Sequence, residues 1–360
     1  MPTALTFAQL SEHPTEFLKL QQYAKPSPGP DEVLVRMLAS PINPQDLMVL
    51  AGKYPVKPHH TQGGEAVPGY DGVGEIIQRG EQVTRLSVGQ WVIPKQHGQG
   101  TWRSHAVVHE NSLICVSNNM DVRFAAVLKM CVTPAYLLLE DMRNLKPGDW
   151  ILQNAASGLI GRMVVQFARV KGLRSINIVR DREDEQATAK MKATLSELGA
   201  DLVLTETEIS ELKEPLSNGR RIMLGLDAVF GASGALLAAQ LSPDATYVNY
   251  GSLGAASSCF ELTQELIFWK QITFKNFRLS TCLNARSEEE VADMIDWFVK
   301  LHQGGLLSAK DMDLFYWNVC DAEASREDVE VHLKRAVSKA ASRNVGEAKK
   351  TLFRFDYCQH

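Results

Sequence analysis

The chain has 360 residues, of which 45% are hydrophobic and 22% are charged, and its formal net charge is -4. Because this length exceeds the size at which one hydrophobic core usually keeps growing, we expect two domains. The composition argues against a disordered chain, a membrane protein and a nucleic-acid-binding protein, so the expected partner is a small molecule. The six cysteines form no Cys-x-x-Cys pair, which is typical of reduced thiols.

Residues 1–124 alternate short apolar runs with glycine and proline turns. The runs at 33–37, 74–78, 90–94 and 104–108 have the length and composition of short strands. This part of the sequence therefore predicts a compact, mostly antiparallel β domain with few helices.

From about residue 125 to 285, strand-like and helix-like segments alternate. Six strands separated by helices predict a doubly wound parallel sheet, which is an α/β architecture. The predicted strands lie at residues 151–152, 175–179, 202–205, 222–228, 246–250 and 272–277.

A glycine turn follows the first of these strands and precedes an apolar helix. Gly158 and Gly161 stand where the backbone would have to turn tightly and approach a pyrophosphate. The helix start after them would offer unpaired N–H groups to that anion. Glycines also end strands for conformational reasons alone, so the pair by itself leaves both interpretations open.

The second predicted strand ends in Arg180-Asp181-Arg182. An acidic residue at this place usually receives the ribose hydroxyls of NAD, whereas arginine accommodates the 2′-phosphate of NADP. Two arginines around one aspartate favour NADPH as the cofactor.

The last predicted strand, residues 272–277, is expected at an edge of the parallel sheet. An edge presents unpaired backbone groups and has to be covered or paired, and self-pairing about a two-fold axis is the simplest closed solution. We therefore expect a homodimer. The alternative is an edge blunted by Lys275 and Asn276.

The tail from residue 286 contains one amphipathic helix pattern, at 291–301, followed by a charged stretch at 322–350. The charged stretch is most simply a solvated helix and loop. The alternating segment at 351–355 is expected to pair back onto the first domain.

A β domain, a nucleotide-binding domain and a returning tail in this order resemble the medium-chain dehydrogenase/reductase superfamily. The resemblance implies a GroES-like catalytic domain over residues 1–124, a Rossmann domain over 125–285, and a return to the catalytic domain over 286–360. Zinc-binding members hold their metal with a cysteine and a Gly-His-Glu motif, where this chain has Asn43 and Tyr70. We therefore expect no metal.

Among the zinc-free branches, the chain resembles the mitochondrial-type trans-2-enoyl-thioester reductase family. This resemblance implies the NADPH-dependent reduction of enoyl thioesters carried on coenzyme A or acyl carrier protein. It also implies the mitochondrial matrix, with the cytoplasm as the alternative because the first twenty residues show no transit peptide. The segments that carry it are 40–46, 52–54, 100–103, 147–150, 153–155 and 177–182.

In this family a loop tyrosine donates a proton, and the matching residue here is Tyr54. Hydride delivery to the β-carbon of an enoyl thioester leaves a carbanion-like α-carbon that must be protonated. A phenol with a pKa of about 10 stays protonated at neutral pH and can act as the general acid. Taken alone, Tyr54 would be interpreted as a loop tyrosine packing beside Pro55 and Pro58.

The resemblance also implies cofactor contacts along the chain. Six of them belong to the glycine turn and two to the end of the second strand, and the others lie before and after that unit. They are Asn154, Ser157, Gly158, Leu159, Ile160 and Gly161 for the pyrophosphate, Arg180 and Arg182 for the 2′-phosphate, Tyr250, Gly251, Ser252, Leu253, Phe277, Arg278 and Leu279 towards the nicotinamide, and Thr133 and Lys349 as further cofactor contacts.

The chain departs from the family pattern at three places. Cys131 replaces an asparagine that touches the cofactor, with Thr133 as the available substitute, Arg278 replaces an aromatic residue, and the loop at 61–66 is longer. These changes put the acyl group and carrier in doubt more than the reaction. A quinone or alkenal reductase, and a cofactor-binding protein without turnover, remain alternatives.

Overall fold

The computed structural model describes residues 1–182, 184–254, 257–319, 326–342 and 349–357. The chain divides into two compact units. Unit 1 comprises Met1–Met130, Ala292–Gln303 and Ser308–His360, and unit 2 comprises Cys131–Val291 and Gly304–Leu307. The domain boundaries that we expected at residues 124 and 285 stay a prediction.

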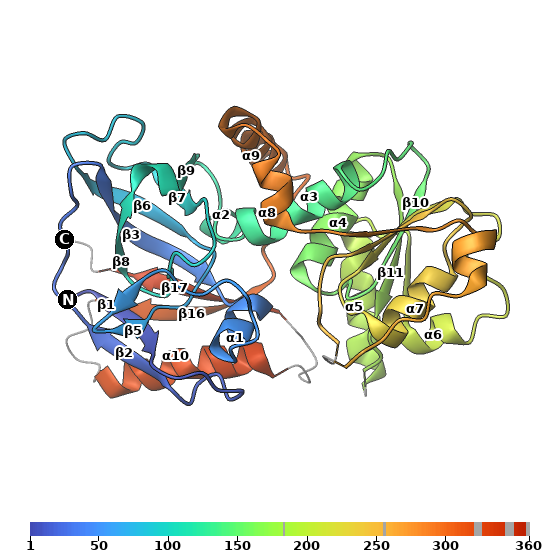
Figure 1. The fold of residues 1–360 in the computed structure, drawn as a ribbon, viewed down its shortest axis with the longest axis horizontal. Helices are drawn as coiled ribbons and strands as arrows, with labels where there is room; N and C mark the ends of the chain where they lie inside the picture. The colour runs from blue at the N-terminus through green and yellow to red at the C-terminus, as the bar shows by residue number, and fades with distance from the viewer. Residues whose placement is uncertain (183, 255–256, 320–325, 343–348, 358–360) are drawn as a thin grey trace. The chain divides into compact units, whose positions relative to one another are not determined.

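Unit 1 is built on a seven-stranded sheet with an edge-to-edge order of β16, β17, β3, β6, β7 and β9, while β8 also pairs with β3 (Figure 1). Strand β17 runs antiparallel to β3, so the C-terminal segment does return to the first β sheet as expected. The strands are β3 (Glu32–Pro41), β6 (Val73–Arg79), β7 (Trp91–Pro94), β8 (His105–His109), β9 (Leu113–Val116), β16 (Met312–Asn318) and β17 (Lys350–Asp356).

A second sheet of unit 1 has the order β2 (Leu18–Gln22), β1 (Thr3–Phe7), β5 (Glu65–Ala66) and β4 (Thr61–Gln62). The sequence analysis treated residues 61–66 as a longer loop, and in the structure they form the hairpin β4–β5. Gly63 and Gly64 at its turn have φ values of 57° and 82°, which suits the left-handed conformations of tight hairpin turns.

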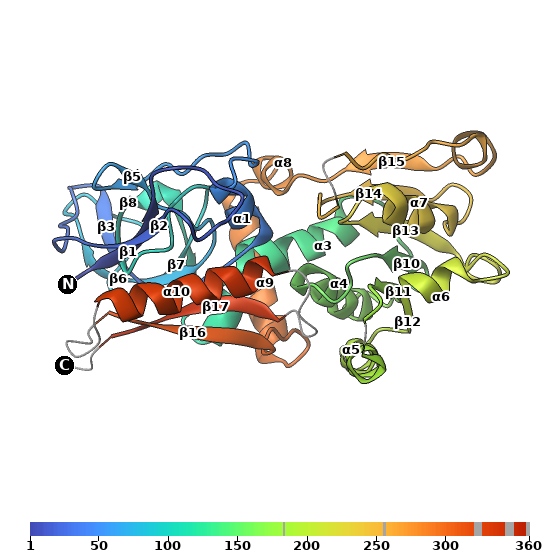
Figure 2. The ribbon, with the colours of Figure 1, turned by 90° about the horizontal axis from the view of Figure 1, so that it is seen from below.

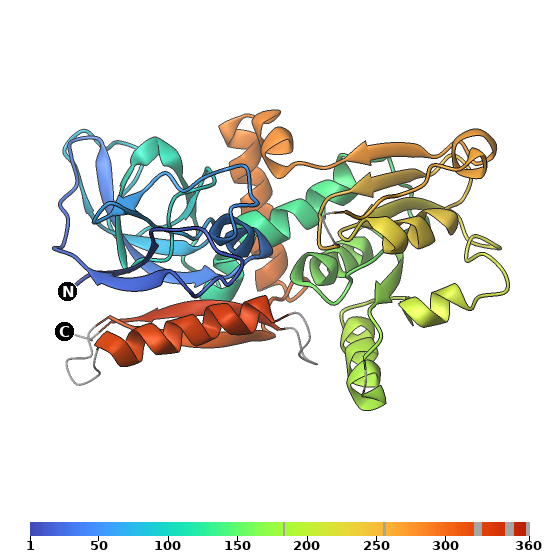
Figure 3. The same ribbon diagram turned by 60° about the horizontal axis from the view of Figure 1, so that its bottom comes forward.

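Helix α10 (Arg326–Ala341) corrects one expectation from the sequence. We expected a solvated helix in this charged stretch, but Leu333, Ala336 and Val337 are fully buried against the core of unit 1. Figures 2 and 3 show the helix lying along β16, β17 and β2. Three shorter helical elements of unit 1 are α1 (Pro44–Leu50), η1 (Glu110–Ser112) and α2 (Val122–Ala125).

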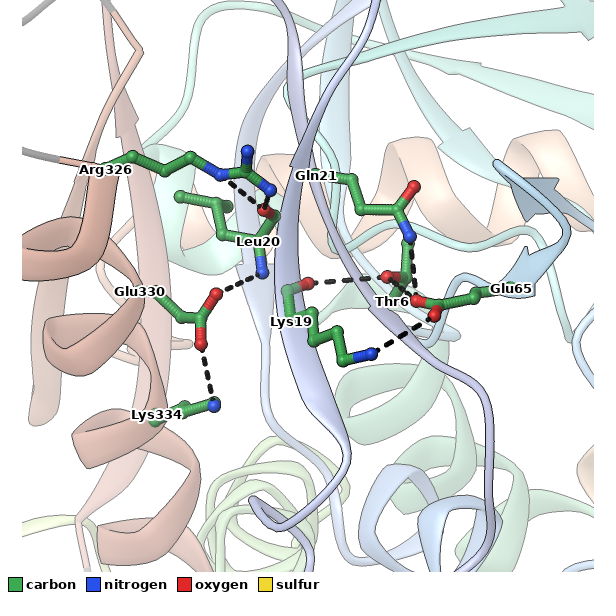
Figure 4. A network of polar contacts seen from close by, with 8 residues as sticks. All are labelled: Thr6, Lys19, Leu20, Gln21, Glu65, Arg326, Glu330 and Lys334. Atoms are coloured by element: carbon green, nitrogen blue, oxygen red, sulfur yellow. Dashed lines mark hydrogen bonds and ion pairs between the residues drawn. The ribbon is translucent and has the colours of Figure 1, made fainter.

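Helix α10 also covers the edge strand β2 by means of two side chains (Figure 4). The Glu330 carboxylate accepts a hydrogen bond of 2.8 Å from the Leu20 backbone N–H, and the Arg326 guanidinium donates to the Leu20 carbonyl. These groups occupy the backbone positions that another strand would otherwise pair with.

Unit 2 contains the predicted parallel sheet of six strands. Its order is β12 (Leu202–Thr205), β11 (Arg174–Val179), β10 (Trp150–Gln153), β13 (Ile222–Asp227), β14 (Thr246–Asn249) and β15 (Thr273–Asn276). Figure 2 shows β15 at one edge, as expected. The doubly wound α/β part of the predicted fold class is thereby confirmed.

Alternate side chains of β12 pack on opposite faces of the sheet in unit 2. Leu202 and Leu204 pack with the cluster that includes helices α6 (Glu206–Ser210) and α7 (Gly231–Ala239), whereas Val203 packs with α4 (Leu159–Val170) and α5 (Glu185–Glu197). Helices therefore cover both faces. The helical elements from Leu128 onward are η2 (Leu128–Val132), α3 (Thr133–Glu140), α4 (Leu159–Val170), α5 (Glu185–Glu197), α6 (Glu206–Ser210), α7 (Gly231–Ala239), η3 (Glu265–Trp269), α8 (Leu279–Asn284) and α9 (Glu288–Gln303).

Within the described ranges, no helix combines the length and the apolar character that crossing a membrane requires. Among the same residues no cysteine is joined in a disulfide, and Cys320 and Cys358 lie outside them.

Candidate functional site

The turn between β10 and α4 in unit 2 has the geometry of an anion-binding turn. Gly158 is the N-cap residue of α4. A Cβ atom on Gly161 would lie only 2.7 Å from the Cα of Ala156, so only glycine lets the helix approach the turn this closely. Ala155 itself has a positive φ of 48°. Ser157, Gly158, Leu159, Ile160 and Gly161 thus surround a helix start whose first N–H groups suit a pyrophosphate.

Asn154 and Asp227 form a buried, hydrogen-bonded pair of side chains beside this turn. The Asn154 amide donates a hydrogen bond of 2.6 Å to the Asp227 carboxylate, and its oxygen accepts 2.8 Å from the Ala228 backbone N–H. Asp227 also accepts hydrogen bonds from the backbone N–H groups of Val229 and Phe230. The Asn154 side chain therefore joins the ends of β10 and β13, and its predicted pyrophosphate contact stays a prediction.

The residues after β11 include the two arginines expected to bind a 2′-phosphate, and that role stays a prediction. Arg180 and Arg182 stand in the short loop between β11 and α5, with Arg180 exposed. Between them, the Asp181 carboxylate accepts a hydrogen bond of 3.0 Å from the Thr207 N–H at the start of α6. One oxygen of the aspartate that could receive ribose hydroxyls is thus already engaged.

The residues expected near the nicotinamide fall into two segments of unit 2, and Thr133, expected as a further cofactor contact, lies in a third. Tyr250, Gly251, Ser252 and Leu253 follow β14, and the Leu253 N–H donates to the Ala228 carbonyl at 2.9 Å. Phe277, Arg278 and Leu279 lie between β15 and α8, with Phe277 and Leu279 buried and Arg278 exposed. Thr133 is buried in the first turn of α3.

Tyr54 lies in unit 1, on the loop that follows α1. Its ring packs against the hydrophobic core of that unit and is half-buried. Burial, followed by the nearby carboxylate of Asp46, raises the pKa of Tyr54 above that of an ordinary phenol, so its protonated form is favoured. Within the described parts of the chain, the Tyr54 hydroxyl makes no hydrogen bond.

The two residues at the places of zinc ligands serve the interior of unit 1. The Tyr70 phenol donates a hydrogen bond of 2.5 Å to the Val56 carbonyl, and its ring is fully buried. The oxygen of the Asn43 side chain accepts a hydrogen bond from the Lys350 ammonium. In the described ranges no group of three or more potential metal-binding side chains occurs. Zinc in proteins prefers thiolate and imidazole ligands. The amide oxygen of Asn43, which is hydrogen-bonded to Lys350, and the Tyr70 hydroxyl, which is hydrogen-bonded to Val56, do not fit such a site.

A buried charged cluster adjoins Tyr70. Asp46 and Asp71 are fully buried and Lys129 is 2% exposed. Burial raises the pKa of Asp46 to about 7, raises that of Asp71 and lowers that of Lys129. The Lys129 ammonium donates to the backbone carbonyls of Gln96 at 2.7 Å and Tyr70 at 3.3 Å.

The structure places Lys349 in unit 1, paired with Asp311 at 3.0 Å. Its expected role as a cofactor contact stays a prediction.

The chain is similar to proteins that reduce enoyl groups. Residues 29–130 match the alcohol dehydrogenase GroES-like domain. The mitochondrial enoyl-[acyl-carrier-protein] reductase of Rattus norvegicus is 34% identical over 327 residues, which cover 90% of this chain and 84% of the rat protein.

The chain belongs to the enoyl-[acyl-carrier-protein] reductase family. The medium-chain dehydrogenase/reductase resemblance is thereby confirmed, and the chain is an oxidoreductase by family. A solved complex of Etr1p with NADP and crotonyl-CoA matches with a TM-score of 0.85 at 25% identity, covering 98% of this chain and 99% of that chain. The Etr1p/Etr2p heterodimer of mitochondrial 2-enoyl thioester reductase from Candida tropicalis matches with a TM-score of 0.84, also at 25% identity and with the same coverage.

The sequence analysis missed several polar residues of this enoyl reductase family member, of which Asp227 and Lys129 are buried and Lys350 is partly buried. Asp227, Lys129 and Lys350 organise the surroundings of the predicted site without standing in a recognised motif. One signal was present in the sequence, because Asp227 is a single charged residue inside the strongly apolar run 222–230. Lys129 gave no such signal.

Proposed function

We propose that this chain reduces trans-2-enoyl thioesters, carried on coenzyme A or acyl carrier protein, to acyl thioesters with NADPH and without zinc. Family membership supports the reaction class, and the related Etr1p was solved with NADP and crotonyl-CoA. One observation carries the residue-level proposal. The Tyr54 hydroxyl has no partner among the described residues, while its ring is fixed against the core.

NADPH, when bound, supplies the hydride that forms the new C–H bond at the β-carbon. Tyr54 then completes the reduction by giving up its hydroxyl proton to the α-carbon, and water returns a proton to the phenolate. The raised pKa of Tyr54 keeps the phenol in the donating form before each turnover. The unsaturated carbons thus receive one hydride from NADPH and one proton from Tyr54, and solvent replaces that proton, so each turnover consumes one NADPH and one solvent proton.

The choice of NADPH over NADH rests on the loop after β11. Arg180 and Arg182 supply two cations for a 2′-phosphate, while Asp181 is held by the Thr207 N–H. The close approach that Gly161 allows and the open start of α4 fit the pyrophosphate of the same cofactor.

Zinc independence is proposed from the engaged side chains of Asn43 and Tyr70. Enolate charge would be stabilised by oriented hydrogen-bond donors instead of a metal. Activity should survive exhaustive chelation, and elemental analysis should find no stoichiometric zinc. Loss of turnover on chelation, restored by zinc, would contradict this part of the proposal.

The proposed assembly is a homodimer through the edge strand β15, in the mitochondrial matrix. Phe268 and Trp269, just before this strand, are 62% and 65% exposed, which is unusual for a surface that stays in water. The related Etr1p and Etr2p were solved as a heterodimer, so pairing of two such chains has a precedent. The compartment is taken from the mitochondrial names of the relatives.

The experiment that tests the function compares three acceptors with one enzyme preparation. NADPH oxidation is followed with crotonyl-CoA, a quinone and an alkenal at matched concentrations. We expect the largest kcat/KM for the enoyl thioester. A larger value for the quinone or alkenal would favour those reductase activities, and NADPH binding without turnover of any acceptor would favour a non-catalytic binding protein.

A further inference from the structure

The loop that carries Tyr54 has few means of holding itself in place. Pro55 and Pro58 flank Val56 and Lys57, and because a proline has no N–H, two of these four residues cannot donate a backbone hydrogen bond. Its position must therefore be set from outside. One anchor lies farther along, where the His59 N–H donates to the Gly98 carbonyl at 2.9 Å.

Tyr70 supplies an anchor much closer to Tyr54. Its phenol donates to the carbonyl of Val56, two residues after Tyr54, at 2.5 Å. The two tyrosine rings also meet edge to face, with their centroids 5.9 Å apart at an interplanar angle of 65°. Tyr70 is 0% exposed and its hydroxyl is already bound, so it does not itself reach a substrate.

Tyr70 is in turn held through both of its backbone groups. Its N–H donates to the Asp46 carboxylate at 3.1 Å, and its carbonyl accepts from the Lys129 ammonium at 3.3 Å. Asp46 is fixed by the Asn43 N–H at 2.7 Å, and Lys129 by the Gln96 carbonyl at 2.7 Å. Two buried polar side chains, Asp46 and Lys129, therefore hold Tyr70 from two sides, which makes it a rigid support.

We propose that Tyr70 is a positioning residue for Tyr54: its buried phenol holds the Tyr54 loop and ring so that the Tyr54 hydroxyl meets the α-carbon of the substrate. The proposal rests on the proposed function, because it needs Tyr54 to be the proton donor. It assigns a use in the reaction to a residue that stands at the place of a zinc ligand in metal-dependent relatives.

The first test is Tyr70→Phe, which removes the hydrogen bond to Val56 while keeping the ring beside Tyr54. Because a displacement of about 1 Å can cost on the order of a hundredfold in rate, we expect kcat with crotonyl-CoA to fall by about 10- to 100-fold. The dissociation constant of NADPH should change by less than about twofold, since the pyrophosphate and 2′-phosphate contacts are assigned to unit 2.

Tyr23→Phe is the matched control. Tyr23 also donates its phenol hydrogen bond to a backbone carbonyl at 2.5 Å in unit 1, but that carbonyl belongs to His105 on β8. Losing this hydrogen bond should leave kcat within about twofold of wild type while costing comparable stability. Thermal unfolding of both variants shows whether the protein is folded in each assay.

A stereochemical measurement separates positioning from a general loss of active protein. The reduction is run in D₂O, and the configuration of deuterium at the α-carbon is determined by NMR of the product. Wild type and Tyr23→Phe should deliver deuterium to one face. Tyr70→Phe should give a mixture, because solvent protonates some of the intermediate when Tyr54 is out of place. Merely inactive molecules would leave the product of the remaining active ones on one face.

A double-mutant comparison distinguishes failure of this inference from failure of the proposed function. In a Tyr54→Phe background, Tyr70→Phe should lower kcat by less than about twofold, because the group to be positioned is gone. If Tyr54→Phe reduces kcat but Tyr70→Phe leaves rate and product configuration unchanged, the positioning role is overturned alone. If Tyr54→Phe has wild-type kcat, the donor role and this inference both fail. An equal loss from Tyr70→Phe in both backgrounds would also overturn positioning.

Discussion

At the scale of single residues, Tyr54 decides between an enzyme and a cofactor-binding protein. Tyr54→Phe keeps the ring that packs on the core of unit 1 but removes the proton that would go to the α-carbon. General acid catalysis contributes about 10² to 10⁴-fold, so kcat on an enoyl thioester should fall within that range. NADPH affinity measured by fluorescence titration should stay nearly constant.

A matched control for this prediction is Tyr316→Phe. Tyr316 lies on β16 and is 54% exposed, so losing its hydroxyl should leave kcat unchanged. The quinone reductase alternative expects a small effect of Tyr54→Phe as well, because a quinone oxygen can be protonated by water. Wild-type turnover of the enoyl thioester by Tyr54→Phe would remove the residue from the mechanism.

The arginines after β11 should set the cofactor preference. Each lost charge-assisted contact to the 2′-phosphate is worth about 1.5 to 3 kcal/mol, so Arg180→Ala and Arg182→Ala should each weaken NADPH binding by roughly ten- to a hundredfold. NADH binding should hardly change. Arg174→Ala, at the opposite end of the same strand and paired with Asp201, is the control and should affect neither cofactor. Equal affinities of wild type for the two nucleotides would refute the preference.

The site could be predicted from the sequence only where one residue type is demanded by local chemistry. Gly161 was recognisable because a turn and a helix start require the close approach that the structure shows at Ala156. Tyr54 was recognisable only through family resemblance. Asp227 and Lys129 were not, because their partners are distant in sequence, and a buried charge resembles a surface charge until the fold brings its partners together.

At the scale of elements, the cover of β2 by α10 should contribute measurably to the stability of unit 1. The Glu330 carboxylate receives the Leu20 N–H at 2.8 Å and also pairs with Lys334 at 2.8 Å. Glu330→Ala loses both contacts and should lower the free energy of unfolding by about 1 to 2 kcal/mol. Urea titration followed by the fluorescence of the buried Trp102 and Trp317 measures this change.

Glu330→Gln separates the two contacts of this residue. Glutamine keeps an oxygen that can accept from the Leu20 N–H but loses the ion pair with Lys334, which is partly exposed and therefore weak. We expect glutamine to cost less than half as much as alanine. Equal costs would mean that the ion pair, and not the cover of the strand edge, stabilises this region.

The strands were easier to predict than the packing of the helix that covers them. Strands β3, β6 and β17 are short apolar runs in the sequence, and each contains consecutive buried residues. The apolar stripe of α10 is short and lies among charges, so it was taken for a solvated helix. The hairpin β4–β5 was missed because each of its strands has only two residues.

At the scale of the whole molecule, the acid sensitivity of folding should depend on His105. The residue is 9% exposed, and burial, followed by Lys25 and Arg36, lowers its pKa to about 4. Between about pH 6.5 and 4 the unfolded chain binds a proton that the folded chain does not, so stability falls as the pH falls through this window. His105→Gln should flatten this pH dependence in urea titrations. An unchanged slope would show that His105 is not the group responsible.

The last prediction concerns assembly through β15. Thr273 and Phe277 donate their N–H groups to Ala245 and Asn249, so the alternate residues of this parallel strand direct their backbone groups away from β14. Asn276 is one of these and is exposed. Asn276→Pro therefore removes an outward N–H without breaking the hydrogen bonds to β14. The preceding residue, Lys275, lies in the strand and already has the extended backbone that a following proline requires.

Wild type at micromolar concentration should scatter light as twice the 39.9 kDa chain, whereas Asn276→Pro should shift towards the single chain. Asn276→Ala is the matched control, because it removes the side chain but keeps the N–H, and it should remain a dimer. If Asn276→Ala dissociates as readily as Asn276→Pro, side-chain contacts and not backbone pairing hold the two chains together. A wild-type mass of one chain would instead mean that the edge strand is protected within the monomer. Lys275 would then be the first residue to examine, because its ammonium donates a hydrogen bond of 2.8 Å to the Met142 carbonyl.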